Sequence, residues 1–140
     1  MFLKEIVCCG SVVCKVSLSK AECGMLLNSF NEVLRGFHNV DFESVLGVSK
    51  ACALGYDQGM LEGYESAIGE NVEVELPYRG LAVLQKAMIA VLQDFGCFPG
   101  DYSSRLGTEL DEYLSLLDGL NSMLEEGCRL MCEEVEFDFR

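Results

Sequence analysis

The chain has 140 residues, half of them apolar, and its 10 basic and 23 acidic side chains give a formal net charge of −13. This length can bury a core without metal or disulfide staples, so we predict a single domain over residues 1–140. A chain with this net negative charge repels phosphate backbones and anionic lipid. The composition therefore argues against nucleic acid and membranes as partners and favours a basic protein.

The cysteines and the N-terminus indicate the compartment. The eight cysteines fall short of the roughly 8–10% density of a disulfide scaffold. No small-residue cleavage pattern follows the apolar run 6–14. Glu5 also neutralises the charge of Lys4, whereas a signal peptide begins with a positively charged region. The chain also lacks an uncharged apolar stretch of about 18 residues. We expect a cytoplasmic protein with reduced thiols.

Two strands and two helices are predicted first along the chain. Residues 2–18 are rich in Val, Ile and Cys, and Cys9-Gly10-Ser11 can divide them into two strands. Ser19 and Glu22 then form a capping box that begins a helix. Its apolar stripe consists of Cys23, Leu26, Leu27, Phe30, Val33, Leu34 and Phe37. A loop over 41–47 leads into a second helix. Small residues at four-residue spacing give that helix a smooth face, namely Ala51, Gly55, Gly59 and Gly63.

The same order recurs from residue 70. Alternation over 70–76 predicts a half-buried strand, and Pro77 suits the first turn of the helix that follows. The apolar face of that helix consists of Leu81, Leu84, Met88, Val91, Leu92 and Phe95. A loop over 101–107 leads into a helix that Thr108 can cap. Its stripe consists of Leu110, Tyr113, Leu114, Leu117, Leu120 and Leu124. Alternation over 135–139 predicts a C-terminal strand at about 134–139.

The recurrence extends to residue identities. With an offset of 58, which becomes 60 after an insertion at Pro99-Gly100, residues 16–63 and 74–123 share twelve identical pairs. Chance alone gives about three. The pairs are Val16/Val74, Leu18/Leu76, Leu26/Leu84, Val33/Val91, Leu34/Leu92, Phe37/Phe95, Asp41/Asp101, Ser44/Ser104, Leu46/Leu106, Gly47/Gly107, Leu54/Leu114 and Gly59/Gly119. We predict an α+β fold in which an internal duplication of a strand-helix-helix unit forms one pseudo-symmetric domain with a small sheet.

The cysteines do not form a recognisable metal site. Cys128 and Cys132 share a helical face, and three cysteines near the N-terminus could add thiolates, namely Cys8, Cys9 and Cys14. The spacing matches no standard zinc pattern, so buried reduced thiols are the favoured interpretation. A cysteine-based metal or redox protein stays open as a second alternative to the function inferred below.

Catalytic patterns are also missing from the sequence. His38 is the single histidine, and no nucleophile is placed beside it. Adjacent acids such as Asp111-Glu112 and Glu125-Glu126 diverge by about 100° on a helix, so we expect them to solvate outer faces. The chain has no Gly-rich phosphate loop, serine-nucleophile elbow or His-Glu-x-x-His pattern. We therefore expect neither an enzyme nor a cofactor.

The two loops repeat an acid, an aromatic, a serine and Leu-Gly. These residues are Asp41, Phe42, Ser44, Leu46 and Gly47, and then Asp101, Tyr102, Ser104, Leu106 and Gly107. The simplest interpretation is structural: the aromatic and Leu fill the core, and Gly permits the turn before the next helix.

Segment 26–34, together with the acid-aromatic segment and Arg105-Leu-Gly, resembles small bacterial immunity proteins encoded beside polymorphic toxins. The resemblance covers about a third of each copy, and the first copy has Val45 where the second has Arg105. It implies a protein that neutralises a cognate toxin by binding it. The charge agrees, because basic toxin surfaces would be steered to an acidic partner. The partner-binding acids we predict flank the repeated loops or the ends of the second helices: Asp41, Glu43, Glu62, Glu65, Asp101, Glu109 and Glu112.

A secretion chaperone or assembly adaptor is the first alternative. It would hold an apolar segment of its partner on the glycine face at Gly55, Gly59 and Gly63 or on the terminal strand. Its binding would be nearly independent of salt, whereas an acidic inhibitor would lose affinity as salt rises.

Overall fold

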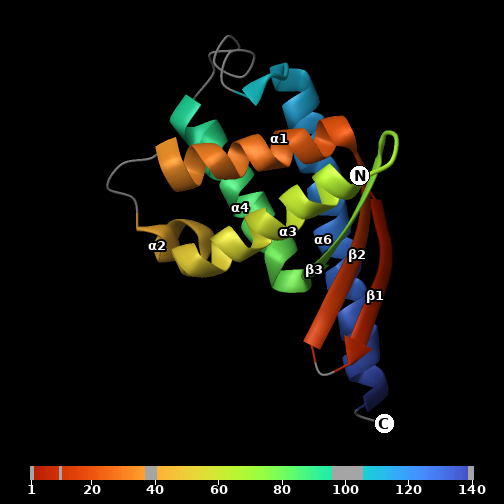
Figure 1. Ribbon diagram of the computed structural model, residues 1–140. Coiled ribbons are helices and arrows are strands. Elements are labelled where there is room, and N and C mark those ends of the chain that lie inside the picture. The colour runs from red at the N-terminus through yellow and green to blue at the C-terminus, as the bar shows by residue number, and fades with distance from the viewer. Residues whose placement is uncertain (1, 10, 37–40, 96–105, 139–140) are drawn as a thin grey trace.

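A computed structural model describes residues 2–9, 11–36, 41–95 and 106–138, and for 2–9, 11, 12, 36, 42, 94, 95 and 130–138 it describes the backbone alone. Over these ranges the chain is α+β (Figure 1). The elements are β1 Phe2–Cys9, β2 Ser11–Ser19, α1 Lys20–Asn31, the π-helical segment η1 Glu32–Gly36, α2 Phe42–Leu46, α3 Lys50–Ser66, β3 Asn71–Pro77, α4 Tyr78–Phe95 and α6 Leu110–Asp138. The α+β prediction is confirmed.

The strands form an antiparallel sheet in the order β1-β2-β3. Val16 of β2 is the ladder partner of Val74 of β3, and both are buried. Alternate residues of β3 are buried and exposed, as the alternation over 70–76 predicts. The predicted pair of N-terminal strands is also confirmed, with β1 ending at Cys9 and β2 beginning at Ser11.

Helix α1 begins at the predicted capping box. The backbone N–H of Glu22 donates to Ser19 Oγ over 3.1 Å, and the backbone N–H of Ser19 donates to Glu22 Oε1 over 2.8 Å. Each bond satisfies a donor that the first helical turn would otherwise leave without a partner.

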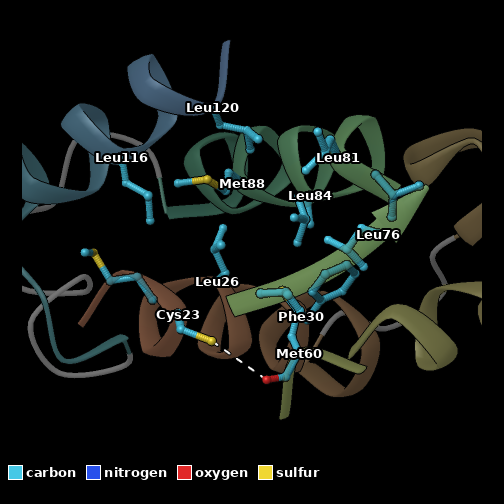
Figure 2. Close-up of a cluster of buried hydrophobic side chains, with 14 of the residues drawn as sticks. Cys23, Leu26, Phe30, Met60, Leu76, Leu81, Leu84, Met88, Leu116 and Leu120 are labelled. Atoms are coloured by element: carbon cyan, nitrogen blue, oxygen red, sulfur yellow. Dashed lines mark hydrogen bonds between the residues drawn. The ribbon is translucent and has the colours of Figure 1, made fainter. Parts of the chain in front are cut away.

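The core lies where α1, α4 and α6 meet, beside the sheet. Figure 2 shows Leu26 and Phe30 of α1 facing Leu84 and Met88 of α4, with Leu120 of α6 beside them. All five side chains are buried. Since burying one such side chain stabilises the fold by about 1.5–3 kcal/mol, this cluster is a large part of the driving force. The apolar stripes predicted for the first helix of each copy therefore face a shared core.

A buried polar link joins the same three helices. Tyr113 of α6 is fully buried, and its hydroxyl lies 2.8 Å from Ser29 Oγ of α1 and 3.5 Å from the carbonyl oxygen of Met88. Ser29 Oγ in turn donates to the carbonyl oxygen of Met25 over 2.8 Å. Among the described side chains, no buried nitrogen or oxygen lacks a hydrogen-bond partner. The link fixes how α1, α4 and α6 pack without burying an unsatisfied polar group.

Helices α4 and α6 run antiparallel. The hydroxyl of Tyr78, at the start of α4, donates to the carbonyl oxygen of Leu124 over 2.7 Å. Further along α4, Gln85 Nε2 donates over 2.8 Å to Oδ1 of Asn121, which precedes Leu124 on α6. The later part of α6 lies beside β1 (Figure 1).

The predicted C-terminal strand at about 134–139 is wrong, because α6 continues as a helix to Asp138. Extending an existing helix fixes one residue for each new hydrogen bond, whereas a new strand needs a turn and an edge to pair with. No proline lies between Leu110 and Asp138, and the three glutamates over 133–136 are good helix formers. Propagation of the helix therefore prevails over the short alternation.

The first repeated loop also contains more helix than predicted. Residues 42–46 form α2, which Asp41 caps and Gly47 ends with a left-handed φ of 78°. The second helix of this predicted copy, α3, is capped by Ser49, whose side chain accepts from the backbone N–H of Cys52. Its predicted smooth face is used in part by the fold, since a Cβ at Gly63 would lie 3.2 Å from the carbonyl oxygen of Glu73 in β3.

The two predicted copies share their order of elements, with β2, α1 and α3 in one and β3, α4 and α6 in the other. Leu46 and Leu106 are both buried, as the repeated loops predict. The glycines that follow them, Gly47 and Gly107, both have positive φ, at 78° and 69°. The duplication itself stays a prediction, which we take up below.

Candidate functional site

The predicted binding acids of the first loop lie at α2. Asp41 Oδ1 accepts from the backbone N–H groups of Glu43 and Ser44, and its Oδ2 accepts from Ser44 Oγ over 2.8 Å. These bonds from the side chain and backbone of Ser44 hold the pKa of the Asp41 carboxyl below its ordinary value. Asp41 is thus the N-cap of α2, while Glu43 is exposed on its first turn. The identity of Asp41 needs no partner to explain it.

Two more predicted acids, Glu62 and Glu65, are exposed on the later half of α3. Gln58 Nε2 donates to Glu62 Oε1 over 3.3 Å. Helix α3 starts near α2, and Glu62 is twelve residues along it from Lys50, or about 18 Å. The α2 pair and the α3 pair therefore belong to different ends of this helix.

Glu109 and Glu112 lie at the start of α6, where it meets α1. A groove of about 380 Å³ runs between the two helices. It is lined by Glu22, Met25, Asp111, Glu112, Ser115 and Leu116. Three carboxylates thus line a shared groove, with the apolar side chains of Met25 and Leu116 beside them. We call it the α1–α6 groove.

A second depression, of about 280 Å³, adjoins the α1–α6 groove and shares Met25 and Glu112 with it. Thr108 Oγ1, on its wall, donates to Glu112 Oε2 over 3.2 Å. Lys20 contributes a cation here, with Nζ 5.4 Å from the centre of the Tyr64 ring. Its ammonium keeps its charge beside the aromatic face, so it offsets part of the negative charge of the acids nearby.

The structure thus divides the seven predicted acids. Glu112 lines the α1–α6 groove, Glu109 is exposed just before α6, the pairs on α2 and α3 lie elsewhere, and Asp101 is outside the described residues. Glu22 and Asp111 were missed. Glu22 had an explanation as a capping residue, and Asp111 was assigned to an outer face. For Glu22 the available signal was the capping box, since it places an acid in the first turn of α1.

Four large apolar side chains are also exposed in the described ranges. They are Ile68 at 97%, Leu54 at 38%, Ile89 at 38% and Leu114 at 40%. Leu114 belongs to the stripe that was predicted to face the core. Single exposed apolar residues are common, so only those with apolar neighbours point to an interface.

Two of the described cysteines, Cys14 and Cys23, are buried thiols as the favoured interpretation predicts, whereas Cys52 is half-buried and Cys128 is exposed. Cys23 is fully buried, its Sγ lies 3.8 Å from the carbonyl oxygen of Met60, and burial raises the pKa of its thiol to about 11. Burial also raises the pKa of Cys14. In the part of the chain with described side chains, no three His, Cys, Asp or Glu residues are grouped to hold a metal ion. The side chains of Cys8, Cys9 and Cys132, like His38, lie outside that part.

None of the helices in the described ranges combines the length and apolar character that a membrane crossing requires. Comparisons with family models, with curated proteins and with solved structures found no match to this chain.

Proposed function

We propose that this chain is a non-enzymatic, acidic binding protein that neutralises a cognate toxin by covering a basic surface of it. The observation that carries the proposal is the α1–α6 groove, in which Glu22, Asp111 and Glu112 line one depression of a chain with a net charge of −13. A groove of this kind suits the cationic head of an Arg or Lys, while Met25 and Leu116 suit its aliphatic stem. The resemblance to immunity proteins adds the toxin as the class of partner.

The electrostatics favour fast association with a basic protein. Clefts lined by one sign of charge focus the field and raise the rate at which an oppositely charged partner arrives. The Debye length is about 10 Å at 0.1 M salt, so this attraction weakens as salt rises. Asp111 and Glu112 are exposed, so water solvates them in the free protein and each ion pair with a partner would add little affinity. Glu22 is half-buried, and its carboxylate already accepts from the backbone N–H of Ser19.

We further infer that the domain is a duplicated unit with a pseudo-two-fold axis. This inference is supported by pairs of contacts whose residues are related by the sequence offsets of 58 and 60. Asn28 Nδ2 of α1 donates to the carbonyl oxygen of Leu106 over 2.9 Å. The equivalent residue on α4, Lys86, has its Nζ beside Gly47, which follows the equivalent leucine. Each Leu-Gly turn thus packs on the first helix of the other copy.

Contacts within each copy agree with the same axis. Lys20 lies over the ring of Tyr64, and their equivalents, Tyr78 and Leu124, are joined by a hydrogen bond. In the sheet, the ladder joins Val16 to its own equivalent in the second copy. An axis through that pair exchanges the ladder pairs on either side of it, so the register and the sequence offset agree.

The test begins with the immobilised protein and lysate of the native organism at low salt, followed by a salt step and mass spectrometry of the eluate. The expected result is one basic protein, whose toxicity in a host cell is relieved by co-expression of this chain. Glu109→Gln with Glu112→Gln should weaken its binding by on the order of tenfold at low salt, as for rim charges close to a partner. The matched control is Glu125→Gln with Glu126→Gln, which removes the same charge further along α6 and should have a smaller effect.

A partner held with the same affinity at low and high salt would contradict the proposal. That outcome would favour the chaperone or adaptor, whose predicted glycine face stays open at Gly55 and Gly59, where an added Cβ would meet no atom within 4 Å. Loss of a salt-resistant partner from a Gly59→Leu variant would then support the alternative.

A further inference from the structure

An apolar strip lies along the outer side of the α4–α6 packing. The hydrogen bond between Gln85 and Asn121 joins the two helices at partly buried positions. Ile89 follows Gln85 by one turn on α4, and Leu117 precedes Asn121 by one turn on α6, so both flank the same side of the antiparallel pair. Leu114 extends the strip by a further turn. Ile89 and Leu114 are 38% and 40% exposed, and we call the strip the α4–α6 seam.

Core packing does not account for the leucine of this seam. Leu114 is identical to its equivalent Leu54, which is 38% exposed. Five other identical apolar pairs have both members buried, namely Val16/Val74, Leu18/Leu76, Leu26/Leu84, Val33/Val91 and Leu46/Leu106. In those pairs the core dictates the residue type. In the exposed pair the core covers each leucine only in part, so burial does not dictate the residue type there.

Charge separates the two leucines. Asp111 and Asp118 lie three residues before and four residues after Leu114, so they share its side of the helix, and both are exposed. Leu54 instead has the exposed Lys50 one turn before it. The α4–α6 seam therefore has an acidic rim at its Leu114 end, while the exposed Lys86 lies one turn before Ile89 at its other end. Around Leu54 the charges are mixed, because the half-buried Asp57 lies three residues after it.

We propose that the α4–α6 seam binds a basic amphipathic helix of the partner, an inference that rests on the proposed function. Apolar residues of such a helix at i, i+3 or i+4, and i+7 would cover Ile89, Leu114 and Leu117. Lys or Arg residues beside them would meet Asp111 and Asp118. Interfaces of this kind take most of their affinity from a few central apolar anchors, and here Leu114 is that anchor.

A synthetic helical peptide provides the probe: eighteen residues with leucines at helical spacing, lysines on the flanks and a fluorescent label. A shuffled peptide of the same composition, without amphipathic order, is the reference. Fluorescence anisotropy at low salt is measured for the wild type and for Leu114→Arg and Leu54→Arg. The two substitutions add the same charge at positions of nearly equal exposure, 40% and 38%. Circular dichroism and thermal melting check that both variants fold.

The seam predicts that Leu114→Arg weakens binding of the amphipathic peptide by about tenfold or more, while Leu54→Arg changes it by less than about twofold. The shuffled peptide should bind the wild type about tenfold more weakly than the ordered one, because it retains the charge attraction alone. Asp111→Asn with Asp118→Asn should flatten the salt dependence more than Glu62→Gln with Glu65→Gln, which removes equal charge from α3.

Equal binding of the two peptides, or equal effects of the two arginine substitutions, would overturn the seam. The native partner separates this failure from failure of the proposed function. A basic, salt-released partner that binds Leu114→Arg as tightly as the wild type overturns the seam and leaves the acidic binding function intact. If the wild type retains no basic partner at low salt, the proposed function itself fails.

Discussion

Alanine substitutions at Gly47 and Gly107 test the packing of the two Leu-Gly turns. Both residues have left-handed backbones, with φ of 78° and 69°. An alanine there costs about 1–2 kcal/mol, because its Cβ approaches the following carbonyl oxygen. A Cβ at Gly107 would meet no other atom within 4 Å, so Gly107→Ala should lower the free energy of unfolding by that amount alone.

Gly47→Ala should cost more, because a Cβ there would lie 2.7 Å from Lys86 Nζ. The ammonium is the flexible end of its side chain and can move, but it then leaves the C-terminal end of α2, where a cation contributes about 0.3–1 kcal/mol. We expect a total loss of roughly 1.5–3 kcal/mol for Gly47→Ala. In a Lys86→Met background the loss should fall to that of Gly107→Ala, since the ammonium has already gone.

Urea unfolding followed by circular dichroism measures all four variants, with the double-mutant cycle isolating the Lys86 contribution. Asn tolerates the left-handed region better than Ala, so Gly107→Asn should recover part of the loss. An unchanged midpoint for Gly107→Ala would refute the left-handed turn. Equal losses for Gly47→Ala with and without Lys86 would refute the contact between the ammonium and the turn.

Two further predictions concern groups that join helices. Tyr113→Phe removes the hydroxyl that lies 2.8 Å from Ser29 Oγ, and it should lower the urea-derived free energy of unfolding by about 0.5–1.5 kcal/mol; a variant as stable as the wild type would show that the link contributes nothing. Burial raises the pKa of the Asp57 carboxyl above its ordinary 3.8, although Arg35, whose guanidinium nitrogen lies 3.9 Å from Asp57 Oδ2, lowers it. The folded state therefore holds the proton of Asp57 more tightly than the unfolded state does. The contribution of Asp57 to stability falls as pH rises above about 4. Asp57→Asn cannot ionise, so its stability relative to the wild type should improve from pH 4 to pH 7 in urea titrations, and a change in the opposite direction would mean that the ion pair outweighs burial.

Local signals in the sequence were sufficient to place most elements. The capping box at Ser19 involves residues three apart, and the alternation over 70–76 involves neighbours, so both can be read without knowing the fold. The prediction for the C-terminal segment was wrong because local alternation favours a strand there, whereas cooperative helix formation extends α6 through it. The prediction of burial was wrong at Leu114, because an apolar stripe shows which side of a helix is apolar but not how far neighbouring elements cover that side.

The candidate site could be predicted only in part because it is assembled from distant segments. Glu112 was among the predicted acids, but the groove it lines also needs Glu22, ninety residues earlier in the sequence. No periodicity links two helices that first meet in the folded chain. The repeat offset does carry information about contacts between distant segments. It relates the hydrogen bond from Asn28 to the carbonyl oxygen of Leu106 to the position of Lys86 beside Gly47.

The duplication that we propose would give the domain two equivalent outer surfaces, which a single partner can distinguish only where the two copies differ. Core positions are alike in the two predicted copies, as Val33 and Val91 illustrate, because both are buried in the same interior. The surroundings of Leu54 and Leu114 differ in charge although both positions hold leucine. By the same offsets, Asn31 and Asp57 occupy the positions of Ile89 and Leu117, so the first copy lacks two of the three apolar residues of the seam as well as its acidic rim. Specificity for a basic helix would therefore reside in the second copy. The amphipathic peptide should bind with a stoichiometry of one per chain in titration calorimetry, and a stoichiometry of two would show that these residues do not select the partner.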